Sequence, residues 1–245
     1  MQIATILPIP YLDLVGGDDT YHMCLAHLLD NKEYLEYFRG KSRRGDSVIM
    51  DNGVVETGLP MEMSILLELA DKVEATELIL PDRLNDAAGT LILGADAIGQ
   101  WYGETGLIAV PQGNTFEEWH ACMKEMLFWP VSTIGISKFT AKFSSSRLEI
   151  LKKSPELIES IKGIHLLGCV AINDEISSIG DAFPGRIKGT DSGIAAIATQ
   201  AGVEISKVKR GDRVNVELDF FNRNLDEYLL TANIGTWRSM CQKGI

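Results

Sequence analysis

Short apolar segments recur along the chain at a nearly constant interval. Seven of them are compatible with buried parallel strands: 3–8, 47–51, 77–82, 107–112, 133–137, 163–168 and 186–191. From the second segment onward their ends are separated by 31, 30, 25, 31 and 23 residues, which is the spacing of repeated strand–helix units. Apolar residues three and four positions apart predict helices between them, as in 61–75, 115–129 and 146–162.

Strand–helix repetition builds either an open doubly wound sheet or a closed (β/α)8 barrel. A chain of 245 residues fits one TIM barrel, which needs roughly 250 residues. We therefore expect an α/β protein with a single barrel domain over 1–245. The eighth strand has the weakest pattern, because 214–218 alternates polar and apolar residues and is also compatible with an edge hairpin. The segment 225–241 predicts a closing amphipathic helix.

Composition narrows the class of protein. The 34 acidic and 23 basic residues give a net charge of −11, so a nucleic-acid partner must be held by local basic patches. The four cysteines include no Cys-x-x-Cys pair, which argues against a disulfide framework and favours a reducing cytoplasm. No apolar run approaches the roughly 20 residues of a membrane span, and the first residues lack the basic region of a signal peptide. We expect a cytoplasmic protein with no membrane partner.

Polar residues follow the predicted strands at the edge where barrel active sites form. They are Asp51, Asp82, Gln112, Ser137, Gly168 and Asp191. A single aspartate there is often a turn former or helix cap, but three at strand ends favour a functional site. Two carboxylates can carry out a retaining glycosyl transfer, one as the nucleophile and the other as the acid and base. A carboxylate beside an amide can recognise the edge of a guanine-like base.

Five short motifs follow these strands in order: IMDNGVVE (49–56), ILPD (79–82), AVPQG (109–113), IHLLG (164–168) and GTDSG (189–193). In that order they resemble the tRNA-guanine transglycosylases, the queuine and archaeosine tRNA-ribosyltransferases. The first is similar to the family's Asp-Ser-Gly-Gly segment, although Asn-Gly follows the aspartate here. The second stands at the base-recognising aspartate, the third and fourth at the Val-Gln-Gly and His-Leu-x-Gly segments, and the fifth at the nucleophile. The resemblance covers about residues 45–195, and the order of the motifs makes it specific.

The resemblance implies a role for each matching residue. Asp191 would be the nucleophile that attacks C1′ of the sugar. Asp51 would be the general acid and base for the outgoing guanine and the incoming 7-deazaguanine base. No cofactor is implied. The residues expected to bind the base or line its pocket are Asn52, Asp82, Gln112, Gly135, Ser137 and Gly168.

The sequence departs from the family after Asp191. Common members bind a structural zinc there through Cys-x-Cys-x-x-Cys and a histidine, whereas this sequence has only Cys241 and no histidine beyond that point. We therefore expect no zinc subdomain and no metal. A zinc-free barrel resembles the virus-associated members that place preQ0-type 7-deazaguanines in DNA, so DNA is the expected partner. The alternatives are a minimal tRNA enzyme and a non-catalytic purine- or nucleic-acid-binding barrel that acts as a partner subunit. A homodimer is also left open, since family members commonly form dimers.

Basic residues must line the approach to a pocket that accepts a nucleotide from a polymer. A guanine within a duplex would have to be flipped out or presented on a single strand. Lys138, Lys142 and Arg147 are interleaved with Phe139 and Phe143 after the fifth predicted strand. We expect the three cations to contact phosphates and the rings to stack on a base, with a solvated loop as the alternative.

The histidines are not expected to catalyse the reaction or to bind metal. His165 lies within an apolar strand, which favours a hydrogen-bonded interior residue over a catalyst. His22, Cys24 and His27 form an H-x-C-x-x-H motif. On a helix these side chains would not converge, and no fourth ligand is near, so the motif is not expected to hold zinc.

Overall fold

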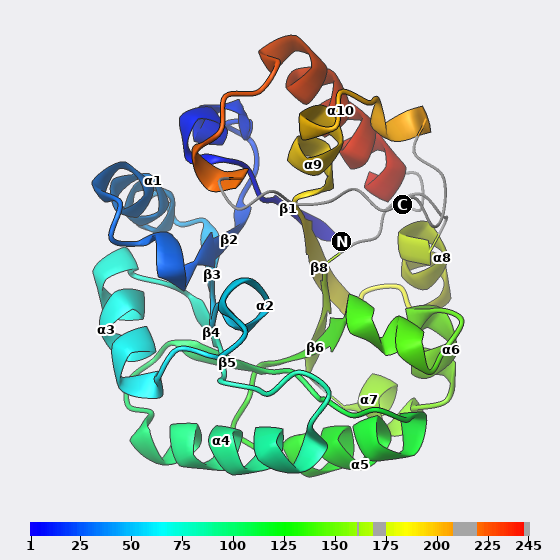
Figure 1. The fold of residues 1–245 in the computed structure, drawn as a ribbon. Helices are drawn as coiled ribbons and strands as arrows, with labels where there is room; N and C mark the ends of the chain where they lie inside the picture. The colour runs from blue at the N-terminus through cyan, green and yellow to red at the C-terminus, as the bar shows by residue number, and fades with distance from the viewer. Residues whose placement is uncertain (161, 169–174, 208–219, 243–245) are drawn as a thin grey trace.

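The computed structural model describes residues 1–160, 162–168, 175–207 and 220–242. Eight parallel strands form one sheet in the order β1-β8-β7-β6-β5-β4-β3-β2. The two end strands contact each other, so the sheet curves into a nearly closed barrel surrounded by helices (Figure 1). This confirms the single-domain TIM barrel. The strands are β1 Gln2–Thr5, β2 Tyr21–Leu25, β3 Ser47–Asp51, β4 Glu77–Ile79, β5 Gly106–Ala109, β6 Thr133–Ser137, β7 Gly163–Leu167 and β8 Ile187–Ser192.

The seven predicted strands are confirmed, most of them with shorter bounds, but the eighth strand of the barrel is β2. The segment 214–218, predicted as the weak eighth strand, lies outside the described residues. β2 pairs in parallel with β3, with Tyr21 opposite Ser47 and Leu25 opposite Asp51. All five residues of β2 are buried, because one face of the strand lines the barrel and the other is covered. Its sequence YHMCL includes polar residues and therefore gives no apolar run.

The helices lie outside the sheet, and none of those described has the length and apolar character of a membrane span. The α-helices are α1 Lys32–Arg43, α2 Val54–Thr57, α3 Met63–Val73, α4 Ala87–Gln100, α5 Phe116–Met126, α6 Arg147–Lys152, α7 Pro155–Glu159, α8 Glu175–Ala182, α9 Ile194–Gln200 and α10 Glu227–Gln242. The 3-10 helices are η1 Ile9–Leu14, η2 Ala26–Leu28, η3 Lys138–Lys142, η4 Ile205–Lys207 and η5 Phe220–Asn222.

Three of the predicted helices are present, as α3, α5 and α10. The single helix predicted over 146–162 is wrong, because it is divided into α6 and α7. Ser154 leaves the helical conformation with φ −125° and ψ 63°. Pro155 explains the break, since its ring disfavours a helical residue before it and its nitrogen has no hydrogen to donate. Pro155 is instead suited to the first turn of α7.

The H-x-C-x-x-H motif lies on a strand and a short turn of helix, not on one helix. His22 and Cys24 belong to β2, and His27 belongs to η2. The Nε2 atom of His22 is 3.1 Å from Oδ2 of Asp46, and Cys24 is fully buried. Within the described ranges, no group of three His, Cys, Asp or Glu side chains could hold a metal ion.

A polar cluster fills the barrel interior near the amino ends of the strands. Glu77 on β4 is buried and accepts hydrogen bonds from Ser132 Oγ at 2.7 Å and Thr133 Oγ1 at 2.8 Å. Its other carboxylate oxygen forms an ion pair with Lys188 on β8. Alternate strands supply such an interior layer in TIM barrels. The negative charge of Glu77 is therefore matched by a cation and two hydroxyl groups.

Candidate active site

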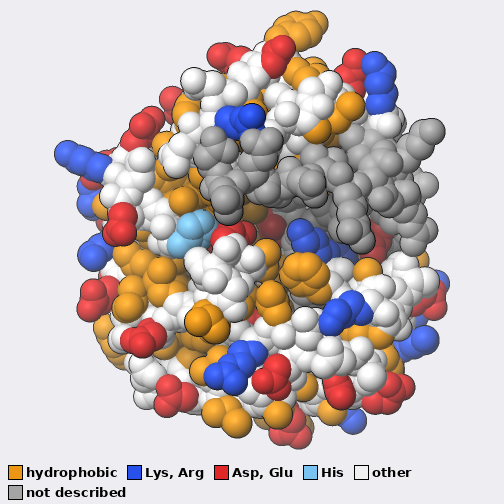
Figure 2. All heavy atoms as spheres, viewed as in Figure 1, with side chains coloured by type: hydrophobic (Ala, Val, Ile, Leu, Met, Phe, Trp, Pro, Cys, Tyr) orange, Lys and Arg blue, Asp and Glu red, His pale blue; other side chains and the backbone are white. Residues whose placement is uncertain are grey.

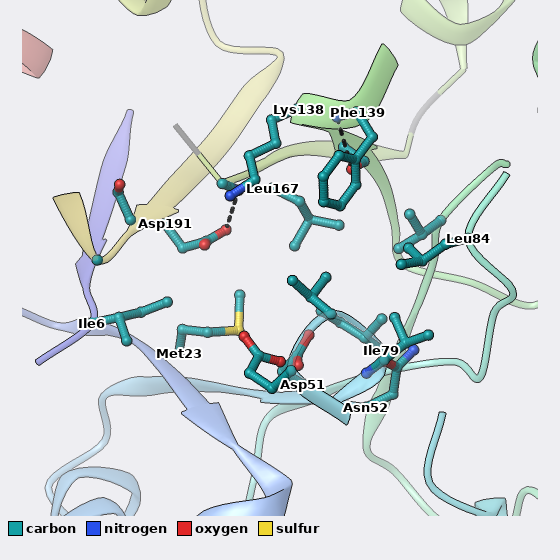
Figure 3. Close-up of a pocket in the computed structure, with 18 of the residues that line it drawn as sticks. Ile6, Met23, Asp51, Asn52, Ile79, Leu84, Lys138, Phe139, Leu167 and Asp191 are labelled. Atoms are coloured by element: carbon teal, nitrogen blue, oxygen red, sulfur yellow. Dashed lines mark hydrogen bonds between the residues drawn. The ribbon is translucent and has the colours of Figure 1, made fainter. Parts of the chain in front are cut away.

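A cavity of about 230 Å³ lies at the carboxyl ends of the strands. Three carboxylates predicted from the strand ends line it, namely Asp51 from β3, Asp82 after β4 and Asp191 from β8. Glu56 on α2 adds a fourth. The apolar part of the wall includes Met23, Ile79, Val110, Phe139, Leu167 and Phe221. Figure 3 shows Asp51 and Asp191 on either side of this space, with Phe139 and Leu167 along the wall.

Asp191 is held through one carboxylate oxygen. Its Oδ1 atom lies 2.9 Å from Nε2 of His165. The same atom accepts a hydrogen bond from the backbone N–H of Gly168 at 3.0 Å (Figure 3). Gly168 has φ +62°, a left-handed conformation that glycine adopts without strain. The Oδ2 atom has no hydrogen-bond partner among the residues that the structure describes. One oxygen of Asp191 is therefore available to a substrate.

His165 connects Asp191 to Tyr21 on β2 through the barrel interior. The ring is fully buried, and its Nδ1 atom lies 2.6 Å from the hydroxyl oxygen of Tyr21 on β2. Burial raises the pKa of Tyr21, and the negative charges of Glu77 and Asp191 raise it further. The prediction of a hydrogen-bonded interior histidine is confirmed. Its contact with Asp191, the predicted nucleophile, could not be predicted from the sequence.

Asp51 is a carboxyl group whose charge is poorly compensated. Its Oδ2 atom accepts a hydrogen bond from the backbone N–H of Gly53 at 2.8 Å. Burial raises the pKa of Asp51 to about 8, with a further contribution from the charge of Glu56, while the bond to Gly53 opposes the rise. Asp191 and Asp82 add smaller contributions in the upward direction. At neutral pH the group therefore holds its proton and can donate it.

Asp82 is clamped between two amide side chains. Its oxygens accept hydrogen bonds from Nδ2 of Asn52 at 2.7 Å and Nε2 of Gln112 at 2.6 Å. Both amides are themselves oriented, since Asn52 also donates to the carbonyl of Leu80 and Gln112 accepts from the backbone N–H of Asn85. Burial raises the pKa of Asp82 to about 6, and the two amide bonds oppose the rise. The structure thus brings together three residues expected to bind the base.

Two other residues expected around the base have different surroundings. Ser137 lines the cavity, and its Oγ atom accepts a hydrogen bond from the N–H of Phe139 at 3.2 Å. Gly135 does not line it, so that prediction is wrong. A Cβ atom on Gly135 would lie 2.8 Å from Leu167 and 3.0 Å from Val110. The glycine therefore allows these two side chains to pack, and they form the wall in its place.

The expected phosphate-binding residues divide into two kinds. Lys138 lines the cavity, and its aliphatic stem passes over Gly168, where a Cβ atom would lie 2.8 Å from Lys138 Cδ. Lys142 is exposed, with its Nζ atom 3.3 Å from Oδ1 of Asn114. Lys138 can therefore reach a ligand in the cavity, and Lys142 is accessible at the surface. Figure 2 shows that Lys and Arg side chains are scattered over the described part of this face and do not gather into one patch.

Arg147 is not placed to contact phosphate, so that prediction is wrong. Its side chain is only 3% exposed and forms an ion pair with Glu175 at 3.0 Å. The guanidinium group also donates to the carbonyl oxygens of Leu167 at 3.2 Å and Gly168 at 2.8 Å. A buried guanidinium needs such partners. Arg147 therefore holds the end of β7, including the glycine that contacts Asp191.

Some residues of the site were not predicted from the sequence. Tyr21 belongs to the strand that was missed, and Glu56 lies on α2, a helix that was not predicted. Phe220 and Phe221 line the cavity from η5, and neither was predicted to belong to the site. One signal was available for His165, because it is a polar residue three positions before Gly168 in an otherwise apolar strand.

Comparisons with known proteins found solved structures of similar fold and gave no information on the reaction. No protein-family model and no curated protein matches the chain. A phosphoribosyl anthranilate isomerase from Thermus thermophilus is 11% identical with a TM-score of 0.42, over 97% of this chain and 100% of that one. An N-acetylneuraminate lyase from Mycoplasma synoviae is 12% identical with a TM-score of 0.48, over 82% and 75%. A 2,3-dimethylmalate lyase is 10% identical with a TM-score of 0.46, over 98% and 91%. Likenesses at these values say nothing about the reaction of this chain.

Proposed function

We propose that this barrel is a guanine transglycosylase that exchanges guanine in DNA for a 7-deazaguanine base of the preQ0 type. The observation that carries the proposal is that three carboxyl groups in one cavity are held in three different ways. Asp191 has one oxygen without a partner among the described residues, Asp51 has a pKa of about 8, and Asp82 is fixed by two amides. Carboxyl groups with such different environments suit a nucleophile, a general acid and a base-recognition group.

The exchange would proceed by two displacements at the same carbon. Asp191 Oδ2 attacks C1′, the bond from C1′ to N9 breaks with its electron pair going to guanine, and Asp51 donates its proton to the departing base. The sugar is then esterified to Asp191. The incoming base gives its N9 proton to Asp51 and attacks C1′, which releases the carboxylate of Asp191. Two inversions give overall retention, as in retaining glycosidases.

The amide clamp supports a guanine-like base. Each oxygen of Asp82 uses one acceptor position for an amide and keeps another for a ligand. The N1–H and N2–H groups of guanine can donate to these positions. Gln112 has a second amide hydrogen for O6, because only one is used on Asp82. Phe139 supplies an aromatic face in the wall of the same cavity.

The choice of DNA over tRNA is supported by the resemblance of the sequence to zinc-free family members. The base would enter the cavity from a single strand or after flipping. The net charge of −11 and the scattered cations imply that Lys138 and Lys142 contact the polymer locally. A minimal tRNA enzyme would use the same three carboxyl groups, so the experiment must distinguish the two polymers.

The test is to incubate the purified protein with labelled guanine and, separately, single-stranded DNA, duplex DNA and bulk tRNA. We expect label in DNA and none after Asp191→Ala. Asp181→Ala is the matched control, because Asp181 is exposed on α8 and outside the cavity that Asp191 lines. Label in tRNA alone would overturn the DNA assignment. Label in no polymer, with binding of guanine retained, would indicate a non-catalytic purine-binding barrel.

A further inference from the structure

A chain of three side chains crosses the barrel interior beneath the cavity. The hydroxyl of Tyr21 lies 2.6 Å from Nδ1 of His165, and Nε2 of the same ring lies 2.9 Å from Oδ1 of Asp191. The residues come from β2, β7 and β8. Tyr21 and His165 are 2% and 0% exposed, so solvent does not compete for these bonds. Neither residue has a part in the two displacement steps described above.

The distribution of hydrogens along this chain follows from the chemistry of its ends. Burial and nearby negative charge raise the pKa of Tyr21, so its hydroxyl keeps its hydrogen. Nδ1 of His165 is the hydrogen-bond partner of this hydroxyl among the described residues, and a hydroxyl that donates there requires Nδ1 to be the unprotonated nitrogen of a neutral imidazole. The single ring hydrogen is consequently on Nε2, where it faces Oδ1 of Asp191.

We propose that Tyr21 and His165 are positioning residues for the proposed transfer, with Tyr21 fixing the Nε2–H tautomer and His165 holding Asp191 so that Oδ2 is presented to the sugar. This inference rests on the proposed function for its kinetic consequences. With the opposite tautomer, the lone pair of Nε2 would face the carboxylate oxygen and repel it. The backbone N–H of Gly168 would then be the remaining donor to Oδ1.

The same two donors also act on the covalent intermediate. When Oδ2 is esterified, Oδ1 becomes the carbonyl oxygen of the ester. When the second base attacks C1′, negative charge returns to the carboxylate, and hydrogen bonds from His165 and Gly168 stabilise it. Removing the histidine donor therefore slows the transfer and favours the esterified form relative to the free carboxylate.

The kinetic test uses Tyr21→Phe, His165→Leu and His165→Gln. We expect kcat to fall about 10-fold for Tyr21→Phe and about 100-fold for His165→Leu, with KM for the base unchanged. His165→Gln should recover much of the loss, because its amide can donate to Asp191. The covalent fraction at steady state should rise in His165→Leu. Thr133→Val is the control, because it removes a buried hydroxyl bonded to Glu77 and does not touch Asp191.

The outcomes separate positioning from a structural role. Unchanged kcat in Tyr21→Phe and His165→Leu would overturn the proposal. A loss without recovery by glutamine, or a covalent fraction that falls together with activity, would show that the histidine only supports the fold. Tyr21→Phe keeps the ring, so it remains informative if His165→Leu fails to fold.

A second measurement does not depend on activity. Nitrogen-15 NMR of labelled histidines reports which ring nitrogen is protonated, and the chain has only four histidines. The His165 signals are those absent from His165→Gln. We expect protonated Nε2 and unprotonated Nδ1 in the wild type, and loss of this single form in Tyr21→Phe. Exchange activity with the hydrogen on Nδ1 overturns the positioning proposal alone. The expected tautomer without any exchange overturns the proposed function and leaves the hydrogen-bond chain standing.

Discussion

Carboxyl groups at the two ends of the barrel differ in how far their negative charge is compensated. Near the amino ends of the strands, Glu77 is matched by Lys188 and by two hydroxyl groups. At the carboxyl ends, Asp51 has one backbone N–H and faces other carboxylates, and its pKa rises to about 8. The matched group stabilises the fold. The unmatched group reduces stability when ionised, which is expected where a proton must be held and released.

The same distinction separates the two types of cation around the site. Arg147 is buried, paired with Glu175 and bonded to backbone carbonyls. Lys142 is exposed and has a single polar contact, to Asn114. Burial with complete pairing makes Arg147 a scaffold residue, whereas the exposed Lys142 keeps the phosphate-binding role that we propose for it.

The largest expected effect contrasts Asp191 with Glu77. Asp191→Asn removes the nucleophile and should lower exchange by at least about 1,000-fold, with little change in the free energy of unfolding. Glu77→Gln leaves Lys188 without its anion and should lower the free energy of unfolding by about 2 kcal/mol, discounted because Lys188 can reach solvent. Exchange assays and urea unfolding measure both. Loss of exchange in a folded Glu77→Gln variant would contradict the claim that Glu77 contributes to the fold and not to the reaction.

The next effect concerns the role of Asp51 in proton transfer. Asp51→Asn should lower exchange by about 100-fold, which is typical for loss of a general acid and base. The wild-type rate should decline as pH rises above about 8, because the first step needs the protonated acid. The variant should lose this decline. The exchange rate of both proteins would be measured as a function of pH. An identical decline in the variant would show that a group other than Asp51 causes it.

Asp51 also predicts a dependence of stability on pH. Because the folded protein binds this proton more tightly than the unfolded chain, the free energy of unfolding should fall as pH rises from about 4 to about 8. The raised pKa of Asp82 should likewise lower the free energy of unfolding as pH rises from about 4 to about 6. Asp51→Asn should therefore melt at a higher temperature than the wild type at pH 8.5, with a smaller difference at pH 5. An equal difference at both pH values would contradict the unmatched state of Asp51.

The smallest effect distinguishes the two cations. Arg147→Ala should lower the free energy of unfolding by about 3 kcal/mol, because the buried ion pair with Glu175 and the bonds to the carbonyl groups of Leu167 and Gly168 are lost. Lys142→Ala should leave unfolding unchanged and reduce the slope of log affinity for DNA against log salt by about 1. Urea unfolding and salt titrations measure these values. If Arg147→Ala has normal stability and a reduced slope of log affinity for DNA against log salt, Arg147 would contact phosphate as the sequence predicted.

The sequence was sufficient for the repeating part of the fold and for the residues that end strands. Strand periodicity identified seven strands, and aspartates at their ends marked Asp51, Asp82 and Asp191. The missed strand β2 has a polar residue on its outward face, His22, whose partner Asp46 lies 24 positions along the chain. Hydrophobic periodicity does not identify such a strand, because the hydrogen-bond partner that allows its polar side chain to be buried lies in a distant segment.

Contacts between distant segments were out of reach for the same reason. The bond between Tyr21 and His165 joins positions 144 residues apart, and that between Arg147 and Glu175 joins positions 28 apart. Arginine in a loop after a strand has the same sequence signature whether it is exposed or buried. Only its acceptors, the carbonyl groups of Leu167 and Gly168, reveal that it supports the fold.

The most direct test of the central claim is to trap the covalent intermediate. Wild-type protein would be mixed with guanine-containing single-stranded DNA without an incoming base, quenched with acid, digested and mapped by mass spectrometry. The account predicts that the DNA, having lost guanine, is attached to the peptide at Asp191, and that Asp191→Asn forms no such adduct. Attachment at Asp51, or exchange of base with no adduct on any residue, would contradict it.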